Sequence, residues 1–368
     1  MSWRALTSVT VAVCLLALTA GQAQAATPGP VSVDGNHLVD GSGDTVRLLG
    51  VNRSGTEYAC AQGWGFTDSP NYNQPDSPSL ISGIVSWHAN AVRVPLNEAC
   101  WLGINGVKPD RGGANYRSKV ATFVKRLEAA GLHPVLDLHV ADPGNYPADN
   151  DTAGLRSMPN VKHSVPFWRQ VAKRYGSDRA IVFDLYNEPN DVGWHCLRDG
   201  CEITKDFYSG DVPHYRAAGT QRLVNVIRNA GAKNVLMVPG IDWTGDLSKW
   251  LKYRPSDPLH RIAASFHNYE GHLGSCYLSC WNSTIAPIAQ RFPVVTGEMG
   301  DVDCNHDYID SYMKWADDHG VSYLGWTWDA TAQGGWTCDG GPSLIKAYDG
   351  TPTDYGVGLR DHLRAINP

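Results

Sequence analysis

The segment AIVFDLYNEPN (residues 180–190) joins an apolar run of strand length to the polar pair Asn187 and Glu188. Pro189 follows at once, and proline has no N–H group with which to continue a central strand. An Asn-Glu-Pro end is poorly suited to filling a core. It is well suited to holding a carboxyl group at the rim of one, so we interpret this segment as a buried strand whose carboxyl end presents Glu188.

Similar apolar runs recur along the chain and alternate with segments of helical periodicity. The eight candidate strands are TVRLLGVN (45–52), NAVRVPL (90–96), HPVLDLHV (133–140), AIVFDLYNEP (180–189), KNVLMVPG (233–240), RIAASFHNY (261–269), FPVVTGEMG (292–300) and YLGWTWDA (323–330). Helices are expected between them, for example over residues 115–131 and 214–231. In the first of these, Val120, Phe123 and Leu127 recur at helical spacing.

The alternation of strands and helices predicts parallel strands joined by helical crossovers. Eight such units in one chain predict an α/β fold, a single-domain (β/α)8 TIM barrel. An open, doubly wound sheet is the alternative. It would place a Gly-rich phosphate-binding turn after the first strand, and LLGVNRSG (48–55) does not have the G-x-G-x-x-G pattern.

The charge of the chain argues against one class of partner. The 368 residues carry a formal net charge of −6, with no basic block or stripe. Phosphate binding requires clustered Lys and Arg, so we expect no nucleic-acid partner. The 13 Trp and 16 Tyr residues fit two interpretations, core packing or surfaces on which sugar rings stack, and composition alone favours the first.

Residues 1–25 have the pattern of a secretory signal peptide. Arg4 supplies a positive charge, VTVAVCLLAL (9–18) is the apolar centre, and residues 23–25 form an A-x-A cleavage site. The apolar run is too short to span a bilayer, and no later run reaches about eighteen apolar residues. We therefore expect a secreted, extracellular protein without a membrane anchor. Residues 26–368 would form its one domain, and we expect a monomer.

The cysteine count fits an exported protein. Of the nine cysteines, Cys14 lies within the expected signal peptide, which leaves eight. An even number favours disulfides, and the absence of any C-x2-C pair argues against a zinc site. All eight follow predicted strands, so they would lie on one face of the barrel. From this placement on the barrel we predict the disulfide pairs Cys60–Cys100, Cys196–Cys201, Cys276–Cys280 and Cys304–Cys338.

Polar side chains gather at the carboxyl ends of the predicted strands, where barrels of this type carry their active sites. Glu188 and Glu298 are the two glutamates that end such strands. Hydrolysis of an acetal needs a proton donor at the leaving oxygen and a negative group facing the developing oxocarbenium ion, and two carboxyl groups supply both. The other candidates at these ends are Arg93, His139, Asn187, His267, Tyr269 and Trp326.

These residues belong to motifs that resemble glycoside hydrolase family 5, the large cellulase-type family. The motifs run in the family's order over nearly all of the expected mature chain. They are LLGVN (48–52), VRVPL (92–96), LDLHV (136–140), FDLYNEP (183–189), FHNYEG (266–271), VVTGEMG (294–300) and GWTW (325–328). The resemblance implies a (β/α)8 barrel, retention of configuration, and neither a cofactor nor a catalytic metal.

Carried over by motif, the resemblance implies that Glu188 is the acid/base and Glu298 the nucleophile. Asn187 would hydrogen-bond the 2-hydroxyl of the sugar at the cleavage point. Arg93 would lie beside Glu298, and Tyr269 would lie close to it.

The remaining candidates would line the same sugar subsite. By resemblance, His139 and His267 would form its walls and Trp326 its aromatic floor, with Trp328 as the second choice. The chain departs from the family at Arg53-Ser54-Gly55 (53–55), where many of its cellulases place an aromatic residue. The preferred sugar therefore stays open.

The resemblance implies a retaining β-glycoside hydrolase acting on a polysaccharide or oligosaccharide, with an endo-β-1,4-glucanase as the leading expectation. The alternatives within this fold are a β-mannanase, a β-1,3- or β-1,6-glucanase, and an exo-acting β-glycosidase or diglycosidase. Two other classes are a sugar-binding protein without catalysis and a metal-dependent hydrolase. The presence of both glutamates argues against the first, and the small number of His residues at the strand ends argues against the second.

Overall fold

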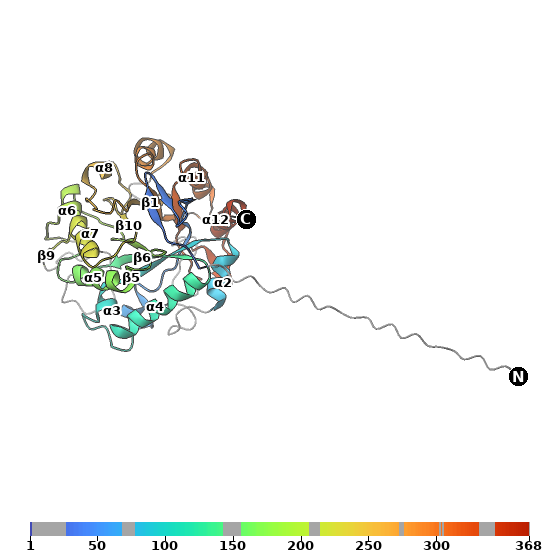
Figure 1. The fold of residues 1–368 in the computed structure, drawn as a ribbon, viewed down its shortest axis with the longest axis horizontal. Helices are drawn as coiled ribbons and strands as arrows, with labels where there is room; N and C mark the ends of the chain where they lie inside the picture. Colours follow the sequence, from blue (N-terminus) through green and yellow to red (C-terminus); the bar gives the residue numbers. More distant parts are fainter. Residues whose placement is uncertain are drawn as a thin grey trace.

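A closed barrel of eight parallel strands forms the centre of the protein (Figure 1). The computed structural model describes residues 27–67, 78–142, 156–205, 214–271, 276–301, 305–330 and 343–367, together with Met1 and Asp303. In spatial order, the barrel strands are β10 (Leu236–Val238), β11 (Ile262–Tyr269), β12 (Val294–Gly300), β13 (Ser322–Gly325), β4 (Leu49–Asn52), β5 (Ala91–Asn97), β6 (His133–Val140) and β7 (Val182–Asp184). Every predicted strand contributes one of them, so the (β/α)8 prediction is confirmed and the open sheet is excluded.

Helices surround the strands in an outer ring (Figure 1). They are α1 (Ala59–Gln62), α2 (Pro78–Ser86), α3 (Glu98–Leu102), α4 (Ala114–Ala129), α5 (Ser164–Tyr175), α6 (Trp194–Asp199), α7 (Thr220–Asn229), α8 (Trp250–Tyr253), α9 (Leu278–Cys280), the π-helical turn η1 (Trp281–Ile285), α10 (Ala286–Ala289), α11 (Asp307–Asp318) and α12 (Asp354–Ile366). In α4, Val120, Phe123 and Leu127 are all buried, which confirms the predicted apolar face.

Several boundaries differ from the sequence predictions, including the strand predicted over 323–330, which ends at Gly325 and leaves Trp326 and Trp328 beyond it. Strand β7 ends at Asp184, so Asn187 and Glu188 lie in the turn beyond it rather than within the strand predicted over 180–189. The helix predicted over 214–231 begins at Thr220. The residues before it form the short strand β9 (Tyr215–Arg216), which pairs with β8 (Glu202–Ile203). The backbone of β9 therefore forms its hydrogen bonds with β8 and not within an extra turn of helix.

A three-stranded antiparallel sheet, absent from the sequence predictions, precedes the barrel. It consists of β1 (Ser32–Asp34), β2 (His37–Val39) and β3 (Thr45–Val46). Val31, Leu38 and Leu48 from this segment share an apolar cluster with residues near the starts of barrel strands, which are Ala91, Val135, Val182, Val235, Met237, Ala263, Val295 and Leu324. The sheet therefore closes the amino end of the barrel. A last pair of strands, β14 (Ile345–Ala347) and β15 (Thr351–Pro352), precedes α12.

Three disulfides join segments that follow barrel strands. The structure forms Cys60–Cys100, Cys196–Cys201 and Cys276–Cys280, which confirms three of the predicted pairs. The fourth predicted pair, Cys304–Cys338, and the expected signal peptide lie outside the described residues. Among the helices that are described, none is long and apolar enough to cross a membrane.

The sheet at the amino end predicts a stability effect without a catalytic one. Leu38 is 3% exposed in the apolar cluster, so Leu38→Ala removes buried methyl groups and leaves a cavity. We expect the free energy of unfolding to fall by about 2–4 kcal/mol, as measured by urea denaturation, with kcat unchanged. The exposed control Ser42→Ala should change stability by less than about 0.5 kcal/mol. An equal effect of both substitutions would contradict this role for the sheet.

Candidate active site

Arg93 lies inside the carboxyl-terminal half of the barrel and is completely buried. Its guanidinium has five polar neighbours within 3.1 Å, which matches its five N–H groups. The contacts are Nε with Asp184 Oδ2 (3.0 Å), Nη1 with Glu298 Oε1 (2.7 Å) and Asn52 Oδ1 (3.1 Å), and Nη2 with Asn187 Oδ1 (2.9 Å) and Asp137 Oδ2 (3.0 Å). One side chain therefore connects β4, β6, β7, the turn after β7, and β12.

Burial sets the protonation of the carboxyl groups around this cation. It raises the pKa of Asp137 and of Asp184 to about 8, although the charge of Arg93 acts in the opposite direction. Burial alone would lower the pKa of Arg93, but the charges of Asp137, Asp184 and Glu298 outweigh it and the pKa is raised. Burial therefore favours the protonated forms of Asp137 and Asp184 more than in water, and Arg93 stays charged.

A bulge in β12 turns Glu298 toward Arg93. Phe266 of β11 pairs with Thr296, and the next residue, His267, pairs with Glu298, so Gly297 is the extra residue. A Cβ atom at Gly297 would lie 3.1 Å from His267 Nε2, so a side chain there would crowd the site. Asn52 holds the bulge, because its Nδ2 donates a hydrogen bond to the carbonyl oxygen of Gly297 (2.9 Å).

Glu298 has two close partners besides the bulge. Arg93 Nη1 lies 2.7 Å from its Oε1, and the hydroxyl of Tyr269 donates to its Oε2 (2.6 Å). Burial and the negative charges of Glu298 and Glu188 raise the pKa of Tyr269 well above its ordinary value, so the phenol keeps the proton that it donates. Both oxygens of Glu298 are thereby fixed in orientation.

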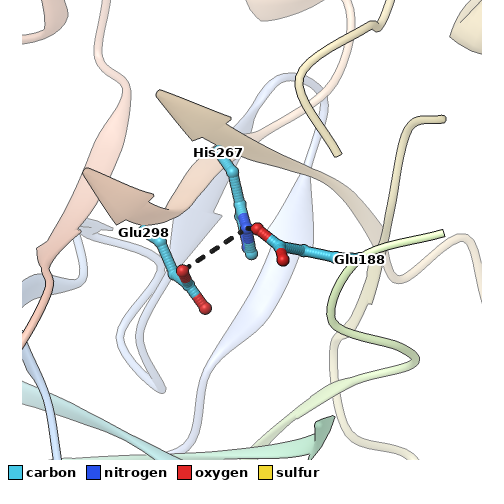
Figure 2. Close-up of side chains that lie close together, drawn as sticks. All are labelled: Glu188, His267 and Glu298. Carbon is cyan, nitrogen blue, oxygen red and sulfur yellow. Dashed lines mark hydrogen bonds and ion pairs between the residues drawn. The ribbon is translucent and has the colours of Figure 1, made fainter. Parts of the chain in front are cut away.

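Glu188 faces Glu298 across the ring of His267, as Figure 2 shows. One oxygen of each glutamate and a ring nitrogen of His267 all lie within 4.8 Å of one another. His267 Nδ1 is 2.9 Å from Glu188 Oε1 and 3.6 Å from Glu298 Oε2. Burial, followed by the charge of Glu298, raises the pKa of Glu188 well above its ordinary value. Burial and the charge of Arg93 lower the pKa of His267, which keeps the imidazole neutral.

His139 and Trp326 are placed together beside this pair. His139 Nδ1 lies 2.7 Å from Asp137 Oδ2, and its ring stacks on that of Trp326, with centroids 5.5 Å apart and an interplanar angle of 12°. Burial lowers the pKa of His139 to about 3, so it is a neutral hydrogen-bonding group. Trp328 is fully buried and packs edge-on against Trp87, so of the two tryptophans it is Trp326 that lies beside His139.

The loop after β10 supports the turn that carries Glu188, and sequence reasoning did not find it. Asp242, Trp243 and Thr244 have φ angles of 54°, 59° and 59°, a left-handed turn that costs non-glycine residues about 1–2 kcal/mol each. Thr244 Oγ1 donates to the carbonyl oxygen of Asn187 (2.7 Å), and its own carbonyl oxygen accepts from His267 N (3.1 Å). The features that identify Thr244 as part of the site are its backbone angle and its contacts with distant residues, and neither is visible in a local sequence motif.

A (β/α)8 barrel with two facing glutamates at its carboxyl end is the arrangement of a glycoside hydrolase. Comparison with known proteins identifies the family. The profile of the cellulase family, glycosyl hydrolase family 5, matches residues 39–332, and the chain belongs to this family. An endoglucanase of Microbulbifer sp. is 23% identical over 349 residues, covering 91% of this chain and 58% of that protein. A mannan endo-1,4-beta-mannosidase of Cellvibrio japonicus is 24% identical over 315 residues, covering 82% of this chain and 59% of that protein.

The solved structures show the same fold. A beta-glucanase from Saccharophagus degradans, crystallised with cellotetraose, matches with a TM-score of 0.68 at 21% identity, covering 95% of this chain and 98% of that chain. The catalytic domain of a Thermobifida fusca endoglucanase matches with a TM-score of 0.61 at 17% identity, covering 91% of this chain and 97% of that chain. The chain spans a little under 60% of the length of the first two curated relatives, so its activity is argued below from its own site.

Removing the hydroxyl of Thr244 should disturb Glu188 and His267 without touching substrate. Thr244→Val keeps the side-chain shape but leaves the buried carbonyl of Asn187 without its donor. We expect kcat on a poor leaving group, such as an unmodified oligosaccharide, to fall about 10–100-fold. An aryl glycoside with an acidic leaving group needs little proton donation and should be affected less. Thr244→Ser should restore activity, and equal losses on both substrates would contradict the positioning role.

The raised pKa values of Asp137 and Asp184 predict that stability falls as pH rises. Each group binds a proton more tightly in the folded than in the unfolded chain, so stability is lost between about pH 4, near the ordinary aspartate pKa, and pH 8. We expect Asp184→Asn to flatten the fall in Tm from pH 5 to 8. The control Asp257→Asn removes a carboxylate whose pKa would be raised by burial but is lowered overall by its hydrogen bonds, chiefly those from Arg228, and it should leave that slope unchanged. An equal or steeper slope in Asp184→Asn would contradict protonation of this residue.

Proposed function

We propose that this protein is a secreted, retaining β-glycoside hydrolase that cuts β-1,4-glucan chains internally. The observation that supports a retaining hydrolase is the separation of Glu188 and Glu298, whose nearest carboxyl oxygens lie within 4.8 Å. Retaining enzymes place their two carboxyl groups about 5–5.5 Å apart, whereas inverting enzymes need about 6.5–9.5 Å to admit a water molecule. The short separation supports a double displacement.

In this mechanism Glu298 attacks the anomeric carbon and forms a covalent glycosyl-enzyme. Arg93 and Tyr269 each bind one of its two oxygens, which fixes the orientation of the attacking carboxylate. Because Arg93 is itself fixed by four further partners, the carboxylate loses little freedom when the sugar binds. Preorganisation of this kind keeps the reacting atoms close to the geometry of attack.

Glu188 is the acid in the first step and the base in the second. Its raised pKa favours the protonated form, which can donate to the leaving oxygen. Once Glu298 is esterified, its negative charge is gone, and the pKa of Glu188 falls. Glu188 can then accept a proton from the incoming water. The neutral His267, hydrogen-bonded at Glu188 Oε1, orients the carboxyl group in both steps.

Three residues are proposed to bind the sugar at the cleavage point. Asn187 turns its Oδ1 to Arg93, and its buried Nδ2 has no hydrogen-bond partner within the described part of the chain. A buried unpaired donor is costly unless a ligand satisfies it, and the sugar 2-hydroxyl is a fitting acceptor. His139 offers its second ring nitrogen, and Trp326 offers an aromatic face for the sugar ring.

The substrate is proposed from the relatives. Endoglucanases make up most of those compared, and the Saccharophagus degradans structure contains cellotetraose. A β-mannanase is the second candidate, because the mannan endo-1,4-beta-mannosidase of Streptomyces lividans is 26% identical over 330 residues, covering 86% of this chain. Secretion is supported by the signal-peptide pattern and by the three disulfides.

Product analysis tests the proposal. The mature protein is incubated with β-1,4-glucan, mannan and β-1,3-glucan, beside Glu188→Gln and Glu298→Gln. We expect a ladder of oligosaccharides from the glucan, a loss of at least about 10³-fold in both variants, and a first-formed β-anomer by NMR. A mannan ladder would favour the second candidate. A single small product would indicate exo action, and a first-formed α-anomer would contradict the double displacement.

The proposed chemistry uses nucleophilic attack by one carboxylate and proton transfer by the other, with no metal ion, so activity should survive chelation. A manganese dependent endoglucanase of Phanerodontia chrysosporium is 28% identical over 211 residues, covering 55% of this chain, which makes the test worthwhile. We expect kcat/KM to change by less than about twofold after dialysis against EDTA, when measured at a temperature well below Tm. A loss that Mn²⁺ restores would contradict the proposed mechanism.

A further inference from the structure

A second cluster of carboxyl groups lies just beyond the strands that carry His267 and Glu298. Glu270 follows the end of β11, and Asp301 and Asp303 follow the end of β12. One carboxyl oxygen of each lies within 4.8 Å of the other two. We propose that these three residues bind one divalent cation, of which Ca²⁺ is the best fit, and that the ion locks the ends of β11 and β12 together.

The burial of Asp301 distinguishes this cluster from an ordinary acidic surface. Asp301 is only 2% exposed. Its Oδ2 receives a long hydrogen bond from Ile309 N (3.4 Å), no group among the described residues donates to its buried Oδ1, and its nearest charged neighbours are the carboxyl groups of Glu270 and Asp303. An unpaired buried carboxylate is strongly unfavourable, and two further carboxyl groups nearby make it more so. A bound cation removes both penalties at once.

The donor set selects the kind of ion. The three groups offer only carboxylate oxygens, which suit hard cations rather than zinc or copper. Asp303 is exposed, and Glu270 is partly exposed, so water can complete the coordination shell. Ca²⁺ accepts six to eight oxygens in flexible arrangements, whereas Mg²⁺ demands a near-ideal octahedron. Ligands drawn from two loops therefore favour Ca²⁺.

The surrounding backbone is arranged to present these groups. Glu270 N donates to the carbonyl oxygen of Gly300 (3.1 Å), which ties the two strand ends before any ion is added. Asn305 donates from its backbone N and from its Nδ2 to the two oxygens of Asp303. The preceding residues Tyr269 and Glu298 belong to the catalytic site, so the ion would brace that site without contacting substrate.

Calcium titration of the EDTA-treated mature protein tests the proposal independently of catalysis. At pH 7.5 we expect calorimetry to show one Ca²⁺ bound per chain. At a free Ca²⁺ concentration about 100-fold above Kd, Tm should rise by about 3–5 °C. Both responses should be lost in Asp303→Asn and in Glu270→Gln, whose exposed or partly exposed side chains make misfolding an unlikely cause of the loss.

Matched variants separate this site from other sources of metal binding. Asp307→Asn removes an exposed carboxylate near Asp303 that is outside the cluster, and it should keep the full response. Glu188→Gln should also keep it. No Ca²⁺ response in the wild type, a response retained in Asp303→Asn and Glu270→Gln, or a response lost only in Glu188→Gln would each overturn the proposal. None of these outcomes depends on whether the proposed hydrolysis is correct.

Discussion

The contacts of the buried Arg93 guanidinium are the interactions on which the carboxyl-terminal half of the barrel depends. A cation without water around it is stable only when its donors are all met, and five side chains meet them within 3.1 Å. Those partners come from β4, β6, β7, the turn after β7, and β12. The positions of Asn187 and Glu298 are therefore consequences of one shared contact rather than independent features of two strands.

This arrangement divides the barrel into two layers with different tasks. Near the amino end the interior is apolar and is closed by Leu38 and its neighbours in the first sheet. Near the carboxyl end the interior is polar, and its stability comes from the hydrogen bonds and ion pairs around Arg93. The apolar layer stabilises the fold, which allows the polar layer to keep carboxyl groups in states that would be unfavourable elsewhere.

Much of the fold was predictable because barrel strands are buried on both faces and read as short apolar runs. The residues that the structure brings together at the candidate site were predictable because polar groups at strand ends stand out against those runs. Asn187 and Glu188 illustrate the limit, since a run of sequence does not show where Asp184 ends the strand and the turn begins. The first sheet was missed because strands of two or three residues have too little periodicity to detect.

Other features depend on three-dimensional contacts that no single segment contains. The bulge at Gly297 becomes evident only from the register of β12 against β11. The left-handed turn at Thr244 is held by contacts with residues far away in sequence. The raised pKa values of Asp137 and Asp184 follow from burial, against the opposing charge of Arg93. In each case the sequence supplies the side chain, and the closed barrel supplies the environment that gives it a role.

The most direct test of the account is the identity of the carboxylate that attacks the sugar. A 2-deoxy-2-fluoro-β-cellobiosyl fluoride slows both steps but retains a good leaving group, so a glycosyl-enzyme accumulates in a double displacement. Mass spectrometry of the intact protein and of its peptides should show one fluorocellobiosyl group attached to Glu298. Attachment to Glu188 or to another carboxylate, or full turnover of natural substrate by a protein that never becomes labelled, would contradict the central claim.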